Sequence, residues 1–331
     1  MGFVTNISDF GSLAIVGLEK NTGKTECLNY ILGQLGGQAD RFALTSVGID
    51  GESRDQVCQT AKPEIEIPEG MIFVTSEKHY REKRLAAEVL DVSLERTALG
   101  RLITARARMS GKLLLSGPSD TAGLKALIDR LKARGVGTTI VDGALSRLSL
   151  ASPAVTEAMI LATGAAVAGN IPELVRKTKY VYELIGIEEI EEALRTRLDP
   201  LTQGVWAVSD GGEPIDLGLP SERSGENLFR HGRRIYATGI VTDKLFQLLR
   251  TQQREVELIV RDFTRVFASP EAFYAFLRRG HRIRVVHRSR LLAVTVNPTA
   301  PSGLVLDSRR LCEAMQEALQ IPVYDVKKMP E

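Results

Sequence analysis

The chain has 331 residues, of which 44% are hydrophobic and 25% charged, and its formal net charge at pH 7 is +2. This composition is typical of a globular protein long enough for two domains, and the near-zero net charge gives no general reason to expect nucleic acid or membrane partners. The scattered cysteines, Cys27, Cys58 and Cys312, predict no disulfide framework and favour a reducing compartment. No apolar run reaches the ~18 to 20 residues of a membrane span, and the first residues lack a signal-peptide layout. We therefore expect a cytoplasmic protein.

Short β-rich runs alternate with amphipathic helical stretches along the whole chain. This alternation predicts an α/β fold with a mostly parallel sheet flanked by helices. In the first part of the chain, strands are expected at 13–17, 41–47, 71–74, 112–115 and 138–141, and helices at 24–35, 122–133, from Pro153 onward and at 187–198.

Residues 209–228, SDGGEPIDLGLPSERSGENL, are rich in Gly, Pro, Ser and charge. A surface loop or β-hairpin would have this composition, and so would a junction between domains. We favour the junction, because the alternation of strands and helices resumes after it. The prediction is a first domain over 1–204 and a smaller α/β domain over 205–331, the latter a candidate for partner binding.

The stretch AIVGLEKNTGKTECLNYIL, residues 14–32, places Gly23-Lys24-Thr25 between an apolar strand and an amphipathic helix. The usual phosphate-binding loop has four residues between its first glycine and this triplet, whereas five separate Gly17 from Gly23 here. A glycine-rich turn in this context presents backbone amides to phosphate, and the helix N-terminus adds positive potential. The context favours a nucleotide loop over an accidental GKT on a surface helix.

In this interpretation Lys24 stabilises the β- and γ-phosphates, and the Thr25 hydroxyl ligates Mg²⁺. The expected cofactors are ATP and Mg²⁺. GTP is the alternative, because no NKxD guanine signature is evident and Asn297-Pro298 is too generic to use. The residues expected to contact the nucleotide are Gly17, Glu19, Lys20, Asn21, Thr22, Gly23, Lys24 and Thr25.

Two aspartates that follow predicted strands are candidates for the metal and for catalysis. Asp142 in TTIVDGALSR is expected to hold Mg²⁺ directly or through water. Asp50 in VGIDGE is expected to position the attacking water or to ligate the metal. Each has a plainer interpretation: Asp142 as a turn or capping residue, and Asp50 with Gly51 as a type I′ turn.

Two further segments have open interpretations. SGPSD, residues 116–120, would supply N–H and hydroxyl donors to a ligand or form a plain Pro-Ser turn. RRGHRIRVVHRSR, residues 278–290, would be a solvated face with Arg282 and Arg284 outward, or a surface for an anionic partner. Its two histidines have no zinc-site context.

The loop and the VDGA segment resemble those of dethiobiotin synthetase and the cobyric acid synthases, which share the Gly-x5-Gly-Lys-Thr spacing. Glu19 stands where the altered-arm variant of this class carries a second lysine, which disfavours that subfamily. A wider set of segments resembles a family of bacterial proteins encoded beside lysine 5,6-aminomutase, described as the P-loop subunit of its reactivase. These segments are IVGLEKNTGKTECLNYIL, TSVGIDGE, SGPSDTAGL, IVDGALSRLSLASP, NPTAP and IPVYDV, and they span nearly the whole chain.

This resemblance implies a P-loop NTPase fold and a MutS-like ATPase subunit as partner. It also implies a role in exchanging damaged cobalamin on an adenosylcobalamin-dependent aminomutase of lysine degradation. Only Gly17, residues 21–25 and Asp142 carry over as functional positions.

The prediction is therefore a slow ATPase whose nucleotide state is coupled to a partner, with loops 48–56 and 116–122 as the segments expected to move. One alternative is an ATP-dependent synthetase or kinase acting on a small carboxylate or amine. The other is an interaction protein that binds nucleotide without catalysis.

Overall fold

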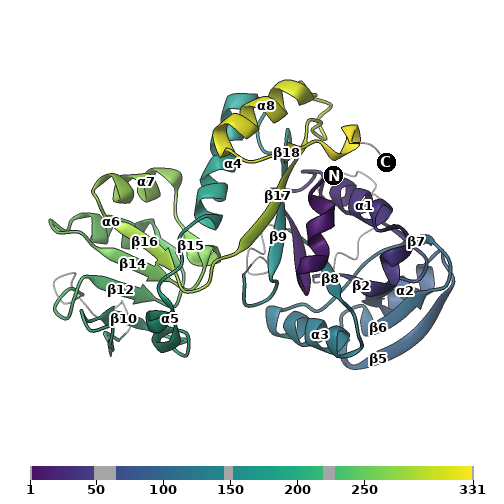
Figure 1. Ribbon diagram of the computed structural model, residues 1–331, viewed down its shortest axis with the longest axis horizontal. Helices are drawn as coiled ribbons and strands as arrows, with labels where there is room; N and C mark the ends of the chain where they lie inside the picture. Colours follow the sequence, from purple (N-terminus) through teal and green to yellow (C-terminus); the bar gives the residue numbers. More distant parts are fainter. Residues whose placement is uncertain (1, 48–64, 145–151, 219–227, 330–331) are drawn as a thin grey trace. The chain divides into compact units, whose positions relative to one another are not determined.

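The computed structural model of the protein describes residues 2–47, 65–144, 152–218 and 228–329 (Figure 1). The chain forms two compact units, which we call unit 1 (Met1–Lys179 with Arg290–Glu331) and unit 2 (Tyr180–Ser289). No helix within the described ranges is long and apolar enough to cross a bilayer.

Unit 1 is built on a mixed sheet with the strand order β18-β17-β9-β1-β8-β2-β4-β6-β5. Its neighbours are parallel from β18 to β4, whereas β6 runs antiparallel to β4 and β5. The strands are β1 (Ser12–Gly17), β2 (Phe42–Ser46), β4 (Ile72–Ser76), β5 (Ala87–Thr97), β6 (Gly100–Ala107), β8 (Thr138–Ala144), β9 (Ala158–Gly164), β17 (Arg290–Asn297) and β18 (Val323–Tyr324). The predicted α/β class with a mostly parallel sheet is confirmed.

The central strands of this sheet are near-continuous apolar runs because helices cover both of their faces. Every residue of β1, β2 and β9 is buried. On one face, Leu28 and Ile31 of α1 join Leu13 and Ile15 of β1 in the main hydrophobic core. The helices of unit 1 are α1 (Lys24–Gln34), α2 (Glu77–Glu82), α3 (Thr121–Ala133), α8 (Ser308–Leu319) and the first part of α4 (Ile171–Ile185). Smaller elements are the strands β3 (Ile65–Ile67) and β7 (Gly111–Leu113) and the 3-10 helices η1 (Phe3–Asp9), η2 (Gly36–Arg41) and η7 (Val326–Lys328).

Unit 2 has its own sheet with the order β11-β10-β12-β14-β16, in which β12, β14 and β16 are parallel. Its strands are β10 (Val205–Val208), β11 (Pro214–Asp216), β12 (Arg234–Ala237), β14 (Glu257–Val260) and β16 (Arg282–Val285), with the short pair β13 (Val241–Thr242) and β15 (Val266–Phe267) and the 3-10 helix η6 (Phe263–Arg265). Helix α5 (Glu192–Leu198) packs against the face that carries Tyr236 and Ile259. Helices α6 (Asp243–Arg250) and α7 (Pro270–Arg278) lie on the other side of this sheet (Figure 1).

The division between the units differs from the predicted boundary at 204/205. Residues 180–204 belong to unit 2, and residues 290–331 return to unit 1. The reason is a long-range pairing, because β17 enters the large sheet parallel to β9. The Gly- and Pro-rich composition of 209–228 marks the β10–β11 hairpin instead of a junction, as far as this segment is described.

Three other expectations on secondary structure need correction. The prediction of a helix from Pro153 onward is wrong, because β9 occupies 158–164. All seven residues of β9 are buried, and this burial outweighs the helical spacing of apolar residues. The helix expected at 187–198 begins only at Glu192, because the preceding residues pair with β16 through the Ile190 amide and the Val285 carbonyl at 2.9 Å. The β5–β6 hairpin was not among the predicted strands.

Candidate functional site

The Gly17–Gly23 loop leaves the carboxyl end of β1, where open parallel sheets collect ligands. Strand β1 lies between β8 and β9 and is parallel to both, with Ile15 opposite Asp142 of β8. The structure therefore brings the GKT loop and Asp142 to the same edge of neighbouring strands, as the sequence predicts.

The loop folds back on itself so closely that only glycine fits at position 17. A Cβ on Gly17 would lie 2.4 Å from Thr22 Oγ1 and 2.9 Å from Lys24 Cγ. Thr22 is buried, and its hydroxyl donates to the Glu19 carbonyl oxygen at 3.0 Å. The stem of the Lys24 side chain therefore lies close to Gly17 at the end of β1.

The backbone of the loop has the features of an anion-binding turn. Asn21 and Gly23 have positive φ values of 61° and 89°, and turns with left-handed residues direct successive N–H groups toward one side. Helix α1 begins at Lys24 directly after Gly23, which provides no side-chain cap. Its first amides consequently have no partner within the helix, and they add to the positive end of the helix dipole.

Asp142 lies half-buried on β8, directly opposite Ser46, the last residue of β2. Its carbonyl oxygen accepts hydrogen bonds from the Val47 amide and the Ser46 hydroxyl, both at 3.3 Å. Burial raises the pKa of the Cys27 thiol to about 12; a hydrogen bond with Thr295 opposes this shift, and the charge of Asp142 adds to it. Since Cys27 lies in the first turn of α1, the Asp142 carboxylate is close to the start of that helix.

The predicted metal ligands Thr25 and Asp142 supply the oxygen atoms that Mg²⁺ prefers. Among the described residues, no three His, Cys, Asp or Glu side chains are grouped to hold a metal ion. Mg²⁺ is usually held by one or two carboxylates, with phosphates and water completing its shell. Asp142 and the Thr25 hydroxyl would suffice for that. Asp50, the other predicted ligand, and the predicted mobile loop 48–56 lie outside the described residues.

The SGPSD segment lies between β7 and α3. The Ser116 hydroxyl is buried and contacts His79 Nδ1 and Ser76 Oγ, each at 2.9 Å. Gly117 lies so close to Ser46 that a Cβ would be 1.8 Å from its carbonyl oxygen, and Asp120 caps α3 by accepting from the Gly123 amide at 2.8 Å. The Ser116 hydroxyl is thus hydrogen-bonded within the protein, and Asp120 caps α3. That loop 116–122 moves stays a prediction.

A residue of the distant strand β17 contacts the loop. Asn297 ends β17, and its Nδ2 donates to the Asn21 carbonyl oxygen at 3.2 Å. A Cβ on Gly23 would lie 2.9 Å from the Cβ of Asn297. Asn297 therefore supports the GKT loop from outside. Only the sheet order could reveal this role, because the two residues are 276 positions apart.

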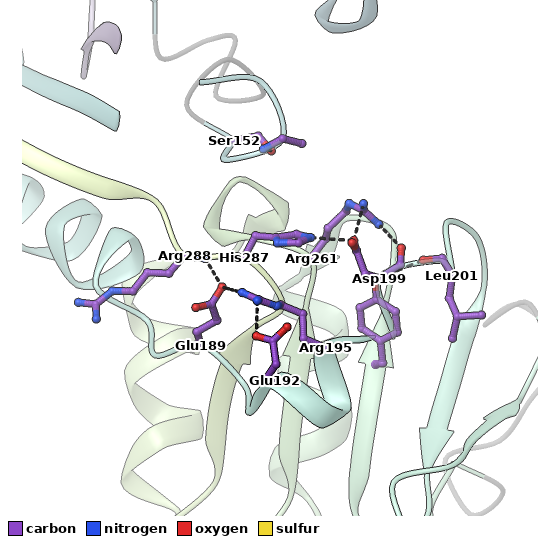
Figure 2. Close-up of polar contacts among 11 residues, drawn as sticks. Ser152, Glu189, Glu192, Arg195, Asp199, Leu201, Arg261, His287 and Arg288 are labelled. Carbon is purple, nitrogen blue, oxygen red and sulfur yellow. Dashed lines mark hydrogen bonds and ion pairs between the residues drawn. The ribbon is translucent and has the colours of Figure 1, made fainter. Parts of the chain in front are cut away.

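Unit 2 contains a separate cluster of paired charges, drawn in Figure 2. Asp199 Oδ1 accepts hydrogen bonds from Arg261 Nη2 at 2.9 Å and contacts His287 Nε2 at 2.7 Å. Glu189 Oε1 lies 3.2 Å from Arg195 Nη1. The hydrogen bond with His287, together with attraction to charged neighbours, holds the pKa of the Asp199 carboxyl below its ordinary value. These arginines are matched by acids, which is the arrangement of a structural network.

Comparisons of the chain with family models, with curated proteins and with solved structures gave no match.

Proposed function

We propose that unit 1 is a nucleotide-binding domain of the P-loop class that binds ATP with Mg²⁺ and hydrolyses it slowly. The observation that carries this proposal is the closed loop after β1, in which Gly17 admits the Lys24 stem. The uncapped start of α1 and the left-handed Asn21 and Gly23 support it. Together these features match what a triphosphate requires: backbone donors, a mobile cation and a helix N-terminus.

The residues of the chain have distinct roles in this proposal. The Lys24 ammonium group pairs with the β- and γ-phosphates. The Thr25 hydroxyl and the Asp142 carboxylate hold Mg²⁺, which neutralises the charge that develops on the phosphates. Asn297 keeps the loop in shape through the Asn21 carbonyl. Asp50 remains the candidate for positioning the attacking water.

We further propose that nucleotide state is read by a partner, namely a MutS-like ATPase subunit and a cobalamin-dependent aminomutase awaiting reactivation. The sequence resemblance alone supports these identities. A switch is consistent with the site, because γ-phosphate contacts can order loops that another protein recognises.

Phosphate release from Mg·ATP tests the proposal, first with the chain alone and then with each partner added and omitted in turn. Asp142→Asn preserves side-chain shape but removes charge from the metal shell, so hydrolysis should fall about tenfold or more, a barrier change of ~1.4 kcal/mol, with a smaller loss of affinity. Asp129→Asn, an exposed position on α3, is the matched control and should hydrolyse at the native rate.

Other outcomes would replace the proposal. Native hydrolysis by Asp142→Asn would remove this aspartate from the metal site. Turnover that rises with a small carboxylate or amine and needs no protein partner would favour a synthetase. Binding without hydrolysis under every partner condition would favour a non-catalytic interaction protein.

A further inference from the structure

Unit 2 gathers exposed arginines at the edge where its parallel strands begin. β12, β14 and β16 start in register, with Arg234 opposite Glu257 and Glu257 opposite Arg282. The segments just before these strands therefore lie along one edge of the sheet. They contribute the exposed residues Arg230, Arg233, Arg250, Arg254, Arg278 and Arg279, which together we call the basic edge.

The arginines of the basic edge have no acidic partners among the described residues. Within the described ranges, none of its six arginines forms an ion pair with an acid. The acids at the start of these strands are already engaged by strand residues: Glu255 lies 2.7 Å from Arg282, and Glu257 lies 3.5 Å from Arg234. The cluster in Figure 2, where arginines are matched by acids, shows the opposite arrangement within the same unit.

Part of the basic edge surrounds a hollow. Arg250, Thr251, Ala275, Arg278 and Arg279 line a space of about 380 Å³ at the ends of α6 and α7. The two helices are fixed against each other by Phe246 and Phe276, whose ring centroids are 5.2 Å apart. The hollow is thus formed by packed helices, and it has room for a few acidic side chains.

Stabilisation of the helices does not account for the whole arrangement. A cation in the last turn of a helix is favourable, which explains Arg250 and Arg278. Arg279 and Arg254 follow the helices, and Arg230 and Arg233 belong to neither. Like charges grouped without acids repel one another and destabilise the folded state. An anionic ligand would remove this repulsion.

We propose that the basic edge binds an acidic segment of a protein partner, with carboxylates in the hollow between α6 and α7. Guanidinium groups pair bidentately with carboxylates, and the side-chain amides of Gln252 and Gln253 can pair with a peptide backbone. Single-stranded nucleic acid would call for several aromatic stacking platforms, and the described segments of this edge offer no Trp or Tyr, only the half-buried Phe229 and the exposed imidazole of His231. The inference does not depend on nucleotide binding by unit 1.

A fluorescein-labelled oligoglutamate peptide, titrated with the full chain at low and at physiological salt, tests this proposal. The triple variant Arg250→Gln, Arg278→Gln, Arg279→Gln should bind the peptide at least tenfold more weakly than the native chain, and salt should weaken native binding. The control is Arg130→Gln, Arg309→Gln, Arg310→Gln, which removes the same charge from exposed positions of unit 1 and should change affinity less than twofold.

Because the three arginines are exposed and without acid partners among the described residues, the variant should stay folded and lose only the favourable interaction of Arg250 and Arg278 with their helix ends, a loss that thermal melting measures. No binding by the native chain, or an equal loss in both triple variants, would overturn the proposal. Tighter binding of a labelled single-stranded or duplex oligonucleotide, lost only in the Arg250, Arg278, Arg279 variant, would assign the edge to nucleic acid instead.

Discussion

In unit 1, the loop between β1 and α1 offers main-chain amides to an anion, whereas unit 2 offers arginine side chains at the edge where its parallel strands begin. The first arrangement is contiguous in sequence, closely packed and dependent on single glycines. The second is assembled from separate loops and is exposed. No single residue determines how its arginines are arranged. A main-chain site should therefore fail at one substitution, whereas a side-chain site should lose affinity gradually as charges are removed and should respond to salt.

The largest effect is expected from Gly17→Ala, which tests the main-chain side of this comparison. The new Cβ would lie 2.4 Å from Thr22 Oγ1 and 2.9 Å from Lys24 Cγ, so the loop must open. We expect Mg·ATP affinity to fall about 100-fold or more, equivalent to ~2.7 kcal/mol, and the free energy of unfolding of unit 1 to decrease by ~1 to 3 kcal/mol. Calorimetric titration and thermal melting measure the two effects.

Gly33→Ala is the matched control, because nothing lies within 4 Å of a Cβ at that position of α1. Alanine is the better helix former, so this variant should keep its affinity and gain up to ~1 kcal/mol of stability. Equal affinities for Gly17→Ala and the native chain would show that the closed loop does not hold the nucleotide.

The smallest effect concerns the paired charges of unit 2, and it separates structural arginines from those of the basic edge. The pKa of Asp199 is lowered in the folded state, first by its hydrogen bond with His287. Its stabilising contribution is therefore complete above the ordinary value of 3.8 and is lost as the pH falls through the lower, folded value. Asp199→Asn should reduce the stability of unit 2 by ~1 kcal/mol at neutral pH, and the difference should vanish in acid.

Urea unfolding followed through Trp206, the only tryptophan of the chain, measures this effect, because Trp206 lies in β10 of unit 2. Asp210→Asn, an exposed position of the same unit, should unfold like the native chain at every pH. A constant difference between Asp199→Asn and the native chain down to strongly acid pH would contradict the assignment.

The parts of the molecule that can be predicted from the sequence are those whose structure is determined by residues close together in the chain. The apolar run of β1, the spacing of Gly17 and Gly23 and the amphipathic α3 are all decided within a few residues. The two strands that flank β1 show where local prediction stops. The position of Asp142 at the end of β8 is predictable from sequence, whereas β9 is not, because its burial between β1 and β17 makes it a strand.

Long-range pairing accounts for what the sequence could not indicate. The return of β17 to the first sheet fixes both the division of the chain and the contact of Asn297 with the GKT loop. The basic edge has the same origin. The sequence of residues 278–290 is basic, but Arg282 and Arg284 are paired with acids. Arg250 and Thr251, which line the hollow together with Arg278, come from the end of α6.

The central claim is that Lys24 and the loop around it bind the phosphates of a nucleotide. Calorimetric titration with Mg·ATP of the native chain, of Lys24→Ala and of the control Lys132→Ala, an exposed position on α3, tests it most directly. The account predicts that Lys24→Ala loses one charge-assisted contact, about 1.5 to 3 kcal/mol of binding free energy, with an unchanged melting temperature, while Lys132→Ala binds like the native chain. Native affinity in Lys24→Ala, or no binding of Mg·ATP or Mg·GTP by the native chain, would contradict the claim.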